Sequence, residues 1–247
     1  MSKYSVYMTD YPEKLNIYAS ASYGFFSFAL APCVISFLGL GFRLSSDLQI
    51  VCQLGYYLAN FLIAVLIFLP YLRESFFYVT TEPRKFIKNV STGAALIFGL
   101  AIVAVGLGIL FNSPLVAFSM LPAAEVTLFA IPTAVIENQP FWGVLCMVLL
   151  TPFSISLLYY ATGFAYTCSD NPARAYIQVI LITAVPYIVN ALTFWVWYEE
   201  LILYLLHLPV HLIACRVYQK SDTIWAPIAT HMAVNLITCI LYFAIPA

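Results

Sequence analysis

The stretch from Asn138 to Ser169 reads NQPFWGVLCMVLLTPFSISLLYYATGFAYTCS and contains no Asp, Glu, Lys or Arg. A helix needs about 20 apolar residues to cross the hydrocarbon core of a bilayer, and this stretch exceeds that length. Within lipid, a helix satisfies all of its backbone hydrogen bonds internally. The stretch therefore predicts a helix that lies in a membrane.

Other parts of the chain repeat this pattern. Five further charge-free stretches are long enough to cross a bilayer, and one more is shorter. They are Leu15–Phe42, Leu48–Leu72, Asn89–Ala124, Ala175–Tyr198 and Thr223–Ala247, with Leu201–Cys215 as the short one. The chain is 63% hydrophobic and only 9% charged, too little charge to cover a soluble domain of 247 residues. We expect one integral membrane domain over residues 1–247, an all-α, polytopic bundle of seven to eight transmembrane helices.

The basic residues predict how this bundle is oriented. If the N-terminus is cytoplasmic and seven helices alternate in direction, nine of the ten Lys and Arg residues fall inside and only Arg43 falls outside. The positive-inside rule expects this asymmetry. An eighth full crossing between Phe111 and Asn138 would reverse the side of the later basic residues. We therefore expect a re-entrant or interfacial piece there and a C-terminus outside.

The segment between the second and third stretches is both basic and aromatic. Arg73–Lys88 reads RESFFYVTTEPRKFIK. This composition predicts a basic loop, which is suited to the interface of an anionic inner leaflet. The lipid bilayer is the expected partner of the chain. Its net charge of −1 gives no general attraction to polyanions, so nucleic acid is not expected as a partner.

Polar side chains inside the apolar stretches gather in the C-terminal half, whereas the helices within residues 1–124 carry none that is ionisable. Polar groups are costly inside a bilayer, so those present are functional candidates. The candidates are Asn190, His207, His211, His231 and Asn235. His231 and Asn235 stand four residues apart and share one helix face. Such a pair can bind a metal or hold a reacting oxygen, or it can hydrogen-bond to neighbouring helices.

The sequence around His231 resembles a known family signature. The run from Cys215 to Leu236, CRVYQKSDTIWAPIATHMAVNL, is similar to the C-terminal motif of the CPBP family of intramembrane proteases, the CAAX prenyl protease and bacteriocin-processing (Abi-like) group. In that family a short basic turn leads into a pattern similar to tgSlwapilaHaxxN. The matching positions here hold Ser221, Trp225, Ala226, Pro227, His231 and Asn235. The resemblance implies that residues 140–247 form a CPBP-like core, in a multi-pass protein of a bacterial cell membrane.

The upstream motifs of the family align with this chain but have lost their charged residues. The family's first motif, Glu-Glu-xxx-Arg, aligns with TPFSISLLYYA, where Ile155 and Ser156 stand at the glutamate positions and Tyr160 at the arginine position. The second motif, FxxxH, aligns with the segment from Pro186, so that Asn190 replaces the histidine. The site implied by the resemblance thus comprises His231, Asn235 and Asn190, with Ile155, Ser156 and Tyr160 beside them.

These replacements bear on activity. In the family a glutamate activates water, while histidines and asparagine bind a metal or hold the oxyanion. Neither Ile155 nor Ser156 can take a proton from water at neutral pH, and general-base assistance contributes about 10²–10⁴ in rate. The resemblance therefore implies a catalytically degenerate homologue without a cofactor, which binds a membrane peptide, a lipid or a partner membrane protein.

Two alternatives stay open at this point. One is an active CAAX-type endopeptidase with an altered site, metal-assisted at His231. His207, His211 and His231 would then be the zinc ligands, because three histidines form catalytic zinc sites elsewhere. The other alternative is a transporter or a membrane assembly subunit.

Overall fold

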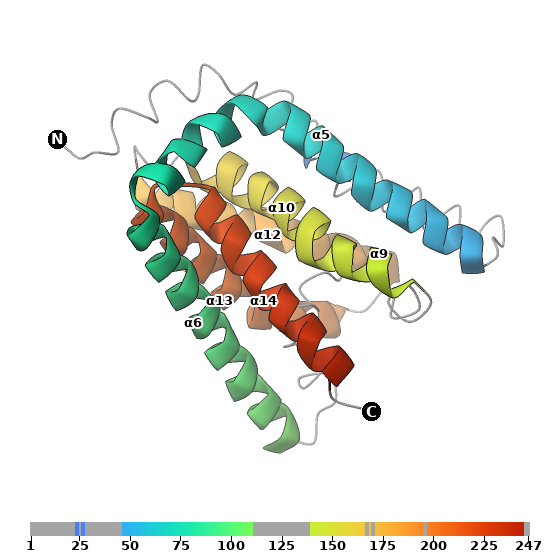
Figure 1. Cartoon of the computed structure of the whole chain (residues 1–247). Helices are drawn as coiled ribbons and strands as arrows, with labels where there is room; N and C mark the ends of the chain where they lie inside the picture. Colours follow the sequence, from blue (N-terminus) through green and yellow to red (C-terminus); the bar gives the residue numbers. More distant parts are fainter. Residues whose placement is uncertain are drawn as a thin grey trace.

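A computed structural model describes residues 23–24, 26–27, 46–110, 139–165, 168, 171–194 and 197–244. All elements of this part are helices, which confirms the predicted all-α class for the described residues (Figure 1). They are α5 (Ser46–Thr81), α6 (Pro83–Leu110), a continuous rod over Pro140–Ala165, α12 (Pro172–Phe194), α13 (Trp197–Ser221) and α14 (Trp225–Ala244). Most of the first predicted stretch and the expected re-entrant piece over 111–138 lie outside the described residues.

Five helical segments of the described chain are long and apolar enough to cross a membrane. They are Leu54–Thr81, Pro83–Val103, Pro140–Ala165, Pro172–Val189 and Glu200–Ser221, and α14 adds a shorter apolar segment, Trp225–Ile240. Large apolar side chains face outward on these helices; Leu66 on α5 is 73% exposed and Ile102 on α6 is 71% exposed. Such surfaces suit lipid rather than water, and they indicate an integral membrane protein.

The predicted loop over Arg73–Lys88 is wrong. α5 continues through Arg73 to Thr81, and α6 begins at Pro83, so Glu82 alone separates the two helices. Proline suits the start of a helix because its missing N–H needs no partner there. α5 has 36 residues and is about 54 Å long at 1.5 Å per residue, whereas the hydrocarbon core is about 30 Å thick. The charged residues mark the end of the apolar layer, not the end of the helix.

The rod over Pro140–Ala165 is the central element of the bundle. It joins α9 (Pro140–Leu145), η3 (Cys146–Leu150), α10 (Thr151–Ser156) and η4 (Leu157–Ala165), where η3 and η4 are π-helical. Two thirds of its most apolar window is buried, against one third or less in the other four spans. In Figure 1 the rod passes between α5 and α14. π-helical turns are rare and often occur at functional sites.

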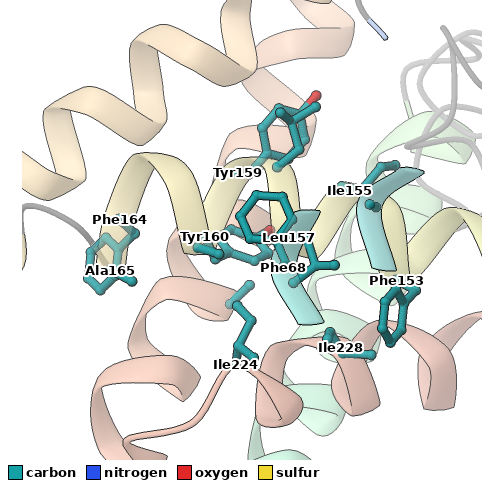
Figure 2. Close-up of a cluster of buried hydrophobic side chains, with 14 of the residues drawn as sticks. Phe68, Phe153, Ile155, Leu157, Tyr159, Tyr160, Phe164, Ala165, Ile224 and Ile228 are labelled. Atoms are coloured by element: carbon teal, nitrogen blue, oxygen red, sulfur yellow. The ribbon is translucent and has the colours of Figure 1, made fainter. Parts of the chain in front are cut away.

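Aromatic and branched side chains form the core around this rod (Figure 2). Phe68 of α5, Tyr160 and Phe164 of the rod, and Ile224 before α14 are completely buried in one cluster. Phe153 contacts the rings of Phe61 and Trp225, with centroids 5.0 and 5.8 Å away. The cluster therefore links the rod to α5 on one side and to α14 on the other.

The α5–α6 corner is joined to the turn between α13 and α14. The Ile224 N–H donates to Ser75 Oγ at 2.9 Å, and Trp225 Nε1 donates to the Leu72 carbonyl oxygen at 2.9 Å. Lys85 forms an ion pair with Asp222 at 2.8 Å. These contacts bring one end of four helices together.

All of the Lys and Arg residues in the described part lie at this same end. They are Arg73, Arg84, Lys85, Lys88, Arg174, Arg216 and Lys220. The start of α12 joins the group because Tyr176 donates a hydrogen bond to Gln219 at 2.9 Å. We call this end of the bundle the basic end.

Gly93 allows α6 to lie close to α13 and α14. A Cβ atom at this position would lie 2.5 Å from Val217 Cγ2 and 3.1 Å from Thr230 Cγ2. Small residues permit such approach between membrane helices. Gly99 on the same helix has no heavy atom within 4 Å of the place of a Cβ.

We expect Gly93→Ala to lower the thermal stability of the detergent-solubilised protein. Overpacking costs about 1–3 kcal/mol, which exceeds the gain of about 0.5–1 kcal/mol from replacing a helical glycine. Gly99→Ala is the matched control, and it should leave the Tm unchanged or raise it. Equal Tm changes for the two variants would contradict this packing of α6.

Candidate functional site

Ser156 and Tyr160 lie one helical turn apart on the central rod. Both side chains are completely buried. Their spacing of four residues directs them to the same side of the rod. The sequence around them carries no charge, so their hydroxyl groups need partners from neighbouring helices.

His231 of α14 is the partner of Ser156. Ser156 Oγ lies 3.3 Å from His231 Nδ1, and either group can be the donor. The rings of Tyr160 and His231 lie 5.8 Å apart. His231 is 4% exposed, and its Nε2 atom has no hydrogen-bond partner among the described residues. Two residues that are 75 positions apart in the chain thus meet in the interior of the bundle.

His211 of α13 is the hydrogen-bond partner of Tyr160. The Tyr160 hydroxyl is 3.0 Å from His211 Nδ1, and the Tyr159 ring contacts the His211 ring edge to face at 5.1 Å. His211 is 2% exposed. Tyr160 therefore contacts two buried histidines that come from different helices. The four residues Ser156, Tyr160, His211 and His231 form what we call the central polar cluster.

Asn235 follows His231 by one turn but does not contact the hydroxyl groups of the cluster in the described structure. Its Nδ2 donates to the carbonyl oxygen of Met147 at 2.8 Å. Met147 lies in the π-helical turn η3, whose hydrogen-bond pattern differs from that of an α-helix. Asn235 therefore fixes α14 against the backbone of the rod.

Two further positions of the aligned motifs, Ile155 and Asn190, are not among the four residues of the central polar cluster. Ile155 is buried and packs within the hydrophobic core, so it adds no polar group to the cluster. Asn190 lies on α12, but its side chain is outside the described structure. The predicted approach of Asn190 to His231 stays a prediction.

Each of the three histidines bonds to a hydroxyl group through its Nδ1 atom. His207 completes the set, since the Tyr187 hydroxyl lies 2.7 Å from His207 Nδ1. In the described part of the chain, no group of three or more His, Cys, Asp or Glu side chains is arranged to hold a metal ion. The proposed zinc set of His207, His211 and His231 gains no support from this arrangement.

The two tyrosine–histidine pairs were not predicted from the sequence. The family resemblance marks Tyr160 only as the residue at an arginine position, and no motif includes Tyr187. Tyrosine is ordinary in apolar stretches, so neither position stands out by itself. The available signal was the spacing of His207 and His211, which places two polar groups on one face of α13 and requires polar partners opposite them.

The cluster is built from neutral hydrogen-bonding groups. A hydroxyl can donate and accept at once, and a neutral imidazole has one donor and one acceptor nitrogen. The residues at the two aligned glutamate positions, Ile155 and Ser156, provide no carboxylate. Such a cluster can orient a bound polar group, but these two positions offer no general base for water.

Comparisons of the chain with protein-family models, curated proteins and solved structures give no match.

We expect Tyr160→Phe to destabilise the protein by about 1–3 kcal/mol, the cost of leaving a buried polar partner without its hydrogen bond. The affected partner is His211 Nδ1. The measurement is thermal or denaturant unfolding in detergent. Tyr198→Phe is the control, because Tyr198 is 73% exposed and the same hydroxyl is removed there. If both variants unfold alike, the Tyr160–His211 bond does not contribute to stability.

Proposed function

We propose that the chain is a catalytically degenerate CPBP-like homologue of intramembrane proteases. In this proposal it resides in a bacterial cell membrane and binds a membrane peptide, a lipid or a partner membrane protein without cleaving it. The supporting observation is the contact between Ser156 and His231 at 3.3 Å. These residues occupy aligned positions in the first and last family motifs, and a shared site requires the two motifs to meet.

The replaced residues support loss of catalysis. Glutamate at the positions of Ile155 and Ser156 would supply a base for water, and arginine at Tyr160 would supply a positive charge. Instead, Ile155 packs in the core and Tyr160 bonds His211. A hydroxyl group and an imidazole remain, and these suit hydrogen bonding to a bound carbonyl or amide group.

We also propose seven crossings with the N-terminus inside, or eight if 111–138 crosses fully. The described Lys and Arg residues all lie at the basic end, as an inner face would require. α6 leaves this end, and the rod returns to it, since Phe164 contacts the rings of Tyr176 and Tyr218. Leu110 and Pro140 then share the opposite end, and this supports seven crossings over eight.

The activity test uses the unaltered protein, purified in detergent and mixed with prenylated and leader-type peptides. We expect neither stoichiometric zinc nor cleavage, while a peptide ligand is retained intact and is lost in His231→Ala. Cleavage that disappears in His231→Ala would show a working enzyme, whereas cleavage that survives this change would point to a contaminant. A protein that neither cleaves nor retains these peptides would exclude peptide binding, and a lipid or a partner protein would remain.

The topology test uses reporter fusions in the membrane of a bacterial host. We expect fusions at Lys14 and after Glu82 to report the inside, and fusions at Gln139 and Ala247 to report the outside. Agreement of Lys14 and Ala247 on one side would favour eight crossings. A fusion after Glu82 that reports the outside would contradict the assignment of the basic end.

A further inference from the structure

One face of α13 carries titratable side chains along its whole length. Glu200, Tyr204, His207, His211 and Tyr218 follow one another at intervals of four, three, four and seven residues. These intervals match the repeat of an α-helix, so all five side chains share one face. From Glu200 to Tyr218 the face extends about 27 Å at 1.5 Å per residue, close to the thickness of about 30 Å of a hydrocarbon core.

Four of these five side chains are buried, and Tyr204 is half-buried. Glu200 and Tyr218 are each 8% exposed, and His207 and His211 are each 2% exposed. Cys215, next to the same face, is completely buried between His211 and Tyr218. A buried row of ionisable groups within a membrane helix is costly, and such rows mark ion and proton pathways.

Hydroxyl groups from three other helices complete the row. Tyr187 of α12 bonds His207 at 2.7 Å, Tyr160 of the rod bonds His211 at 3.0 Å, and Tyr71 of α5 bonds Tyr218 at 2.9 Å. Tyr204 packs beside Tyr187 with ring centroids 5.4 Å apart, and its own hydroxyl donates to the Ile180 carbonyl oxygen at 2.7 Å. Groups that both donate and accept protons therefore recur from one end of α13 to the other.

We propose that this row is a proton path across the bundle, from Glu200 at one end to the Tyr218–Tyr71 pair near the basic end. An imidazole can take up a proton on one nitrogen and release a proton from the other. A hydroxyl group can accept a proton from one neighbour and donate its own to the next. Only O–H, N–H and S–H bonds form and break, and the proton that enters at one end is replaced by one that leaves at the other.

A purely structural role for the same bonds makes a different prediction. Hydrogen bonds between helices stabilise a membrane bundle whether or not the groups titrate. Glutamine can replace histidine as a hydrogen-bonding partner, but it cannot carry a proton at neutral pH. Histidine-to-glutamine variants therefore separate proton transfer from structural support.

The experiment measures proton flux in vesicles that contain the purified full chain. A potassium gradient with valinomycin drives protons across the bilayer, and an enclosed pH-sensitive dye reports them. We expect flux above that of protein-free vesicles, and we expect His207→Gln and His211→Gln each to reduce it to the protein-free level while the helical content is kept. The exposed Tyr198 of the same helix supplies the control Tyr198→Phe, which should conduct like the unaltered protein.

Two results would overturn the proposal. One is that vesicles with the unaltered, folded protein conduct no faster than empty ones. The other is that the flux persists unchanged in both glutamine variants, since it would then pass elsewhere. Because the first comparison needs no variant, the proposal stays testable even if a glutamine variant fails to fold.

Discussion

The bundle depends on the need of buried hydroxyl groups for partners within the protein. Ser156 and Tyr160 of the central rod are completely buried, so their hydroxyl groups need partners within the protein, and they find them on α14 and α13. Apolar packing in lipid leaves helices free to rotate about their axes, because most apolar side chains fit equally well against lipid and protein. The polar contacts remove that freedom. They set which face of α13 and which face of α14 point inward.

The contacts at the basic end add the second restraint. Lys85 pairs with Asp222, and Ser75 accepts the Ile224 N–H just before α14 begins. These bonds hold the turn before α14 against the α5–α6 corner. They therefore fix the axial position of α14 relative to the rod. His231 lies seven residues, or about two helical turns, beyond Ile224 in the direction of the bundle interior. His231 therefore reaches the level of Ser156 because the turn is anchored where it is.

The sequence predicts the helices well where length and absence of charge decide the outcome, as in the rod and in α12. It fails at Arg73–Lys88, because charge shows where lipid ends and says nothing about where a helix ends. The family resemblance predicts that Ser156 and His231 belong to one site, and these two side chains lie 3.3 Å apart. The sequence does not predict the partners of His207 and His211. These partners lie 20 and 51 residues away along the chain, and which helix faces meet depends on how each helix is rotated about its axis.

Asn235 lies beside His231 as expected, but its partner is a backbone carbonyl in a π-helical turn, which no residue pattern indicates.

Under the proposed alignment, the residues at the first motif also have an energetic consequence. Two carboxylates and a guanidinium in a bilayer interior need mutual pairing, because an isolated charge there is very costly. Ile155, Ser156 and Tyr160 carry no such charge, and the hydroxyl groups of Ser156 and Tyr160 are the partners of His231 and His211. Hydrogen bonds among uncharged groups need no bound ion to balance them. The same neutrality restricts what the interior can do: it can bind polar groups or pass a proton briefly from group to group, but it cannot hold a lasting charge.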